Sequence, residues 1–149
     1  MSLKIILILL LSTSAFAQTD VVITSVVHSV ISGQTEYYRI KDRQLFADGN
    51  KEYKEYSEKW HLLQYPEMLS GIGIGVAIGI NDDLSIESVV KETLLAGSIR
   101  WVVRDAVYNL NLHRNMFHIS DVSYDPFKDF GTWAVKLGLL TIIILWNYL

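Results

Sequence analysis

The sequence predicts a mainly α-helical fold, a small membrane protein of about three to four helices. Three observations support this expectation. Half of the 149 residues are hydrophobic and the mean hydropathy is +0.25, both high for a soluble domain of this size. Apolar side chains recur at helical spacing in several long segments. Cysteine is absent, so no disulfide can compensate for a thin core in an exported chain.

The N-terminal segment has the three parts of an export signal. Lys4 supplies a positive charge, residues 5–11 are apolar, and Ala15-Phe16-Ala17 forms a small-residue cleavage motif. We therefore expect residues 1–17 to be a cleaved signal peptide, with export to the membrane as the localisation. Roughly 130 residues then remain, which is enough for one small domain.

The charge balance argues against one class of partner. The formal net charge is −3, whereas nucleic-acid binders usually carry a clear basic surplus. We therefore expect no nucleic-acid partner. The expected partners are membrane lipid and either a second copy of the chain or another membrane protein, the latter two through a glycine-rich helix face described below.

Residues 18–50 are predicted to form an extracytoplasmic N-terminal segment. Val, Ile and Thr are dense from 20 to 31, which favours extended structure, and Ser32-Gly33 offers a turn. These features indicate a short β-hairpin, with a membrane-proximal helix as the alternative for the first run. Asp48-Gly49-Asn50 is a strong breaker and ends the segment.

Residues 51–149 are predicted to be the helical membrane-associated domain. A charged helix with an aromatic stripe covers 51–65, where Glu55 and Lys59 are spaced for an ion pair. This stripe suits a membrane interface, and the alternative is a surface helix of an ordinary bundle. Pro66 suits the first position of a new helix.

A run of glycines follows Pro66. Gly71, Gly75 and Gly79 lie four residues apart, so on a helix they form a smooth groove where another helix can approach closely. The same run alternates small and β-branched residues, which is a strand pattern. We favour the helix, a glycine zipper, because the small-residue spacing repeats. The stretch is short for a membrane span, which needs roughly 20 apolar residues, so the number of spans and the orientation stay open.

Ser85 is predicted to cap the longest helix, residues 86–113. One flank of its second half is apolar, and the other flank carries two polar rows at i, i+4 and i+8. The first row is Arg100, Arg104 and Tyr108, and the second is Asp105, Asn109 and His113. We take these six residues as the candidate binding site.

Two chemical interpretations of the first row remain open. Two arginines with a tyrosine hydroxyl suit a phosphate, and in an exported membrane protein the nearest phosphate is a lipid headgroup. The alternative is an ion-pair network in which Arg100 or Arg104 pairs with Glu67, Asp105 or an acid in the following loop.

The second row offers only weak catalytic signals. Asp105, Asn109 and His113 have the groups of a base with orienting partners. Oxygen and nitrogen ligands follow at His118, Asp121 and Asp125. However, the chain contains neither HExxH nor GxSxG. We therefore expect no metal site and no cofactor, and we favour a non-enzymatic role over an enzymatic one.

Two elements complete the chain. The loop at 115–129 alternates aromatic and acidic residues and is expected to fold back with its acids near Arg100, Arg104 or Arg114, or else to bind a partner. Residues 131–149 are the best transmembrane candidate, with Lys136 extended toward water and aromatic residues at both ends, Trp133, Trp146 and Tyr148. A buried C-terminal helix of a soluble bundle is the alternative.

The sequence therefore predicts an integral membrane protein with a structural or protein-interaction role in the cell envelope. One alternative is a lipid-phosphate-binding or lipid-modifying enzyme that uses the polar face of the 86–113 helix. Another is a pore or lysis-type membrane protein.

Overall fold

A computed structural model describes residues 19–80, 85–118 and 133–148. Within these residues the chain forms α2 (Thr19–Ala47), α3 (Tyr53–Ile80), α4 (Ile86–Asn111) and α5 (Trp133–Tyr148), and no strand. The prediction of a mainly α-helical fold is confirmed. The predicted signal peptide at 1–17 and most of the predicted loop at 115–129 lie outside the described residues.

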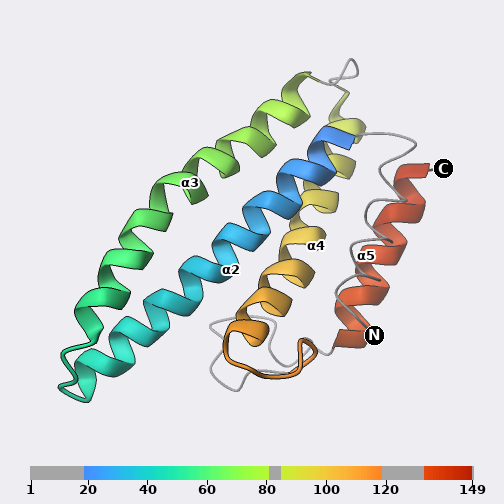
Figure 1. Cartoon of the computed structure of the whole chain (residues 1–149). Coiled ribbons are helices and arrows are strands. Elements are labelled where there is room, and N and C mark those ends of the chain that lie inside the picture. Colours follow the sequence, from blue (N-terminus) through green and yellow to red (C-terminus); the bar gives the residue numbers. More distant parts are fainter. Residues whose placement is uncertain (1–18, 81–84, 119–132, 149) are drawn as a thin grey trace.

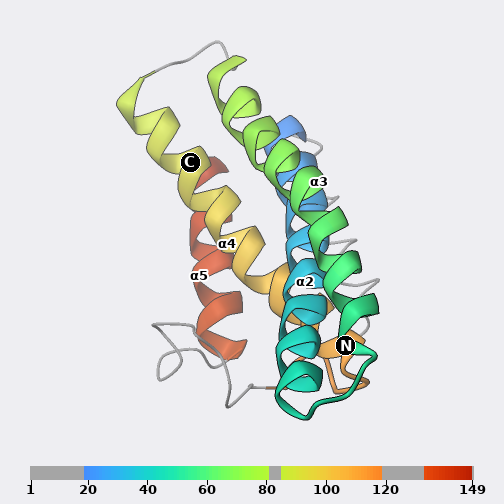
Figure 2. The ribbon, with the colours of Figure 1, turned by 90° about the vertical axis from the view of Figure 1, so that its left-hand side faces the viewer.

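Helix α2 lies between α3 and α4, and α5 packs against the other side of α4 (Figure 1). The α2 and α3 helices form an antiparallel hairpin, and Gly49 adopts φ of +68° in the turn between them. Helix α4 runs in the direction of α2, and α5 runs back along α4. In the view of Figure 2, the α2–α3 and α4–α5 pairs therefore lie next to each other.

The β-hairpin predicted within residues 20–46 is not formed, because α2 passes through this segment as one helix. Ser25, Ser29 and Gly33 lie four residues apart on α2 and are buried. A Cβ atom built on Gly33 would lie 2.7 Å from the carbonyl oxygen of Arg104 in α4. Small side chains thus bring α2 close to α4, and this packing outweighs the weak extended preference of the β-branched residues.

Pro66 does not start a new helix, because α3 continues through it from Tyr53 to Ile80. A proline inside a helix removes one hydrogen bond, from the carbonyl four residues earlier. That carbonyl belongs to Leu62, whose side chain is strongly exposed. Contact of α3 with α2 on both sides of Pro66 keeps the two halves in one helix, as the Trp60–Asp42 and His28–Glu67 hydrogen bonds show.

Helix α4 begins as predicted and ends slightly earlier. The Ser85 hydroxyl accepts a hydrogen bond from the Ser88 amide at 3.2 Å, which confirms the predicted N-cap. The helix ends at Asn111, and His113 adopts a left-handed φ of 54°. The Arg114 amide then donates to the carbonyl oxygen of Asn109 at 3.0 Å, which closes the last turn.

The main core lies between α2, α4 and α5. Its buried members are Val22, Leu95, Ile99, Val102, Val103, Ala106, Trp133, Leu140 and Ile143. A smaller cluster joins Val21, Ala77 and Ala96 of α2, α3 and α4. In the part of the chain that the structure describes, no helix combines the length and the apolar character needed to cross a membrane.

Candidate functional site

The six α4 residues predicted as one binding site have different surroundings. Arg100 and His113 are exposed, and His113 follows the end of the helix. Asp105 and Asn109 make contacts that hold other parts of the fold. Only Arg104 and Tyr108 belong to one polar cluster, and that cluster includes residues of α2.

Asp105 holds α5 against α4. Its Oδ2 atom accepts a hydrogen bond from the Lys136 ammonium, and Lys136 is only 6% exposed. The Lys136 Nζ atom also lies 4.9 Å from the ring centre of Trp101 and 5.6 Å from that of Trp133. The prediction that Lys136 extends to water is therefore wrong: a buried ammonium needs a nearby counter-charge, and Asp105 supplies it.

Asn109 fixes the segment that follows α4. Its buried side chain donates hydrogen bonds from Nδ2 to the carbonyl oxygens of Met116 at 2.9 Å and His118 at 2.7 Å. Phe117, within this segment, packs edge-on against Trp133 with ring centres 5.0 Å apart. Trp133 is buried here, so its predicted place in an exposed aromatic belt is wrong.

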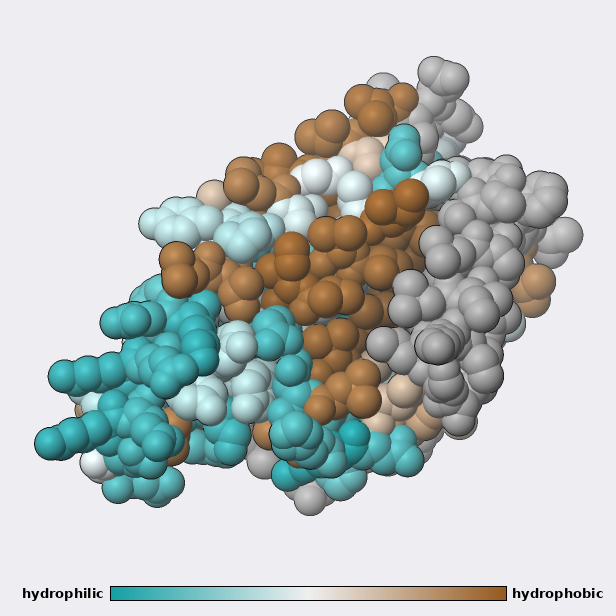
Figure 3. Space-filling model, viewed as in Figure 1, coloured by the Kyte–Doolittle hydropathy of each residue, from teal (hydrophilic) through white to brown (hydrophobic). Residues whose placement is uncertain are grey.

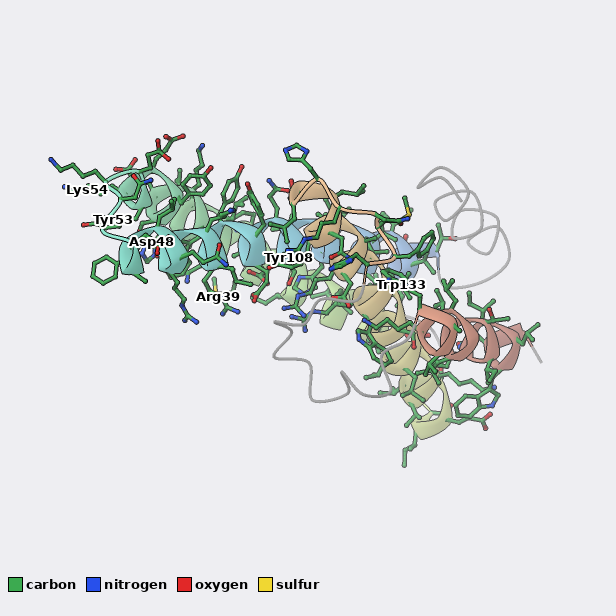
Figure 4. The ribbon with its side chains drawn as sticks, turned by 90° about the horizontal axis from the view of Figure 1, so that it is seen from below. Arg39, Asp48, Tyr53, Lys54, Tyr108 and Trp133 are labelled. Atoms are coloured by element: carbon green, nitrogen blue, oxygen red, sulfur yellow. The ribbon has the colours of Figure 1, made fainter. Side chains whose placement is uncertain are left out.

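A polar cluster connects α2 to α4. The Glu36 Oε2 atom accepts a hydrogen bond from Nη2 of Arg39 and lies 3.5 Å from Nη2 of Arg104. We call Glu36, Arg39, Arg104 and Tyr108 the arginine cluster; Figure 4 labels Arg39 on α2 and Tyr108 on α4. Arg104 therefore does form an ion pair, with Glu36 of α2 and, among the described residues, not with Glu67 or Asp105. The loop acids that the sequence also suggests lie outside the described residues.

The arginine cluster has more donors than acceptors. One carboxylate faces two guanidinium groups, so the cluster carries a positive surplus. The Nε atoms of Arg39 and Arg104 are both buried and have no hydrogen-bond acceptor among the described residues. Burial, and then the charge of Glu36, raise the pKa of Tyr108 above its ordinary value of 10.0. A tyrosine hydroxyl is protonated at neutral pH even without this shift.

Sequence reasoning missed Glu36 and Arg39. They are spaced i, i+3, which is the spacing of an ion pair on a helix. This signal is present in the sequence, but the expected β-hairpin hides it, since i and i+3 side chains point to opposite faces of a strand. The pairing of Glu36 with Arg104 depends on the packing of two helices and has no local signal.

The three predicted packing glycines differ in their surroundings. A Cβ built on Gly71 would lie 3.5 Å from Cε1 of His28, whose Nδ1 atom lies 3.2 Å from the carbonyl oxygen of Glu67. A Cβ built on Gly75 or Gly79 would meet nothing within 4 Å among the described residues. The role of Gly75 and Gly79 in packing against another helix stays a prediction.

Across the described ranges, no group of three or more His, Asp or Glu is placed to hold a metal ion.

Exposed apolar side chains gather at one end of the four helices, which we call the apolar end. Figure 3 shows hydrophobic residues over the upper part of the visible face and hydrophilic residues at the α2–α3 turn. The exposed apolar residues at this end are Ile23, Val27, Val30, Met68, Leu69, Ile72, Val76, Ile80, Ile86, Val89, Val90, Leu94, Val135, Leu139, Ile142, Leu145 and Trp146.

The opposite end is the charged α2–α3 turn, residues 39–59, which we call the polar end. Asp48, Tyr53 and Lys54 lie together at its tip (Figure 4). Aromatic rings stiffen this end: Phe46 packs edge-on against Tyr53, with ring centres 5.2 Å apart. The predicted Glu55–Lys59 ion pair is also present here and is confirmed.

The arginine cluster lies where the apolar end meets the polar end. In α2 the last exposed apolar residue of the apolar end is Val30, and Glu36 follows within two turns. In α5 the exposed Val135 precedes Lys136, whose partner Asp105 is the neighbour of Arg104. Helix α2 thus changes from apolar to polar surroundings close to the level of the arginine cluster. The chain matches no family model, no curated protein and no solved structure.

Proposed function

We propose that this chain is an exported protein of the cell envelope, held in a membrane by its apolar end, with a structural or protein-interaction role. One observation carries the proposal: all four described helices contribute exposed apolar side chains to the apolar end. The α2–α3 turn, by contrast, is hydrophilic on the face that Figure 3 shows. Large contiguous apolar surfaces are rare on soluble monomers and mark contact with lipid or with another protein.

The mode of insertion follows from the lengths of the apolar segments. In α5 the exposed apolar residues from Val135 to Trp146 cover about 16 Å along the helix axis. The hydrocarbon core of a bilayer is roughly 30 Å thick. In this proposal several short apolar segments enter lipid together, and the polar end stays in water, where other envelope proteins can contact it.

The uses of the polar α4 residues support a structural role over a catalytic one. Asp105 is paired with Lys136, and Asn109 is bonded to the backbone after α4. Both side chains therefore stabilise the positions of neighbouring segments. The alternative of a lipid-modifying enzyme needs these two groups for chemistry, and nothing in their geometry favours that alternative.

We expect the processed chain to stay with the membrane pellet after carbonate extraction. A variant with Ile72, Val76 and Ile142 changed to Ser should move largely to the supernatant, because these strongly exposed side chains supply the contact with lipid. The matched control changes Phe46 and Leu110 to Ser, two exposed apolar residues outside the apolar end, and should stay in the pellet. Release of the unaltered chain, or equal retention of both variants, would contradict the proposal.

A further inference from the structure

We propose that the arginine cluster binds a phosphate group, and that this phosphate belongs to the headgroup of an anionic phospholipid. The lipid source of the phosphate depends on the proposed function, since it requires the apolar end to lie in a membrane. The preference for phosphate does not, because it follows from the side chains of the cluster alone.

The charge of the cluster favours a further anion. Glu36 neutralises one of the two guanidinium groups that face it and leaves the second charge uncompensated within the cluster. Two buried Nε donors, one on Arg39 and one on Arg104, have no acceptor in the described ranges. An unsatisfied buried donor costs free energy, so an anionic acceptor at this position stabilises the cluster.

The donor types favour phosphate. A guanidinium presents its N–H groups as a rigid fork that matches the oxygens of a phosphate, and it stays charged at any physiological pH. Tyr108 adds a neutral hydroxyl that can donate, since a tyrosine hydroxyl keeps its proton at neutral pH. The side chains of Arg39 and Arg104 are 39% and 34% exposed, so a ligand can reach their exposed parts from solvent or from the headgroup layer, while each Nε atom itself is buried.

The depth of the cluster favours a lipid source. The cluster lies at the junction of the apolar and polar ends, and with the apolar end in lipid this level coincides with the phosphate layer of the bilayer. Tyr65 of α3 is 70% exposed between the apolar residues of that helix and its charged first half. Exposed tyrosine at such a junction is typical of the interface between lipid and water.

The test measures lipid retention by the full processed chain in nanodiscs. We expect phosphatidylglycerol to be retained preferentially over phosphatidylcholine, as native mass spectrometry or phosphorus NMR line broadening would show. Arg39→Gln and Arg104→Gln should each lower this retention about tenfold, since each removes charge-assisted hydrogen bonds. Arg43→Gln, an exposed arginine on the same helix α2, is the matched control and should retain the lipid as the unaltered chain does.

Folding is checked by circular dichroism for every variant. If Arg104→Gln fails to fold, Arg39→Gln carries the test, because its more exposed side chain is less needed for packing. Equal retention of phosphatidylglycerol and phosphatidylcholine, or retention unaffected by Arg39→Gln, would overturn the proposal.

Two further arms separate the sources of the anion. Inorganic phosphate that binds in detergent and is lost in Arg39→Gln, without any preference for phosphatidylglycerol in nanodiscs, would overturn the lipid source. Retention that is seen only when Asp121, Asp125 and Asp129 are changed to Asn would show that the chain's own acids fill the cluster, and would also overturn the proposal. These three acids lie outside the described residues.

The outcomes also separate this site from the proposed function. If carbonate releases the chain but the chain still binds phosphate through Arg39, membrane retention is refuted and phosphate binding by the arginine cluster is supported. A chain that stays in the membrane without any preference for anionic lipid refutes the site and leaves membrane retention standing.

Discussion

Replacement of Asp105 by Ala is expected to lower the free energy of unfolding by about 3 kcal/mol, the largest effect of any single change that we predict. The variant removes the Asp105 carboxylate from the Lys136 ammonium, which stays buried close to the rings of Trp101 and Trp133. We take the lower end of the usual range because Asp105 is 28% exposed, so water can partly replace it. Denaturant unfolding in detergent micelles measures the change.

A second substitution should recover most of this loss. In the Asp105→Ala, Lys136→Met double variant, a methionine fills the space beside the two indole rings and removes the buried charge of Lys136. The control is Glu55→Ala, which breaks the solvent-exposed pair with Lys59 and should leave stability unchanged within error. A double variant that is no more stable than Asp105→Ala would contradict the role of the buried charge.

Replacement of Gly33 by Ala is expected to destabilise the fold by about 2 kcal/mol, within the range for overpacking of a tight contact. The added Cβ atom would lie 2.7 Å from the Arg104 carbonyl oxygen and 2.9 Å from Cβ of Val107, so α2 and α4 must move apart. Because Ala favours a helix over Gly by about 1 kcal/mol, the steric cost has to exceed this gain.

The matched control for Gly33 is Gly97 of α4. A Cβ on Gly97 meets nothing within 4 Å among the described residues, so Gly97→Ala should raise stability by about 0.5 to 1 kcal/mol. The two changes are chemically identical and differ in sign. Thermal unfolding of both variants in the same detergent measures the two changes in stability. Stabilisation by Gly33→Ala would exclude the close approach of α2 to α4.

Local features of the fold could be predicted from the sequence. Ser85 caps α4 because a serine that precedes an apolar-periodic run satisfies the first free amides of a helix, and this requires only nearby residues. The Glu55–Lys59 pair is local in the same way. The extent of α2 was not predictable by such rules, since its β-branched residues favour strand and only contact with α3 and α4 makes the helix the stable form.

The candidate site could be predicted only in part. Arg104 and Tyr108 share one face of α4, and helical spacing alone brings them together. Their partners Glu36 and Arg39 come from a helix whose position is fixed by the contact at Gly33. The partner of Lys136 could not be predicted for the same reason. That partner, Asp105, lies on α4, and sequence spacing does not show that α5 packs against α4.

The central claim, that the apolar end lies in lipid and the polar end in water, is most directly tested by measuring depth. The chain contains no cysteine, so single cysteines at Ile72, Ile142, Phe46 and Lys54 can carry a nitroxide label without interference. In reconstituted vesicles we predict that oxygen relaxes the labels at positions 72 and 142 more strongly than an aqueous nickel complex does, with the opposite order at 46 and 54. Equal access of the nickel complex to all four positions would contradict the account.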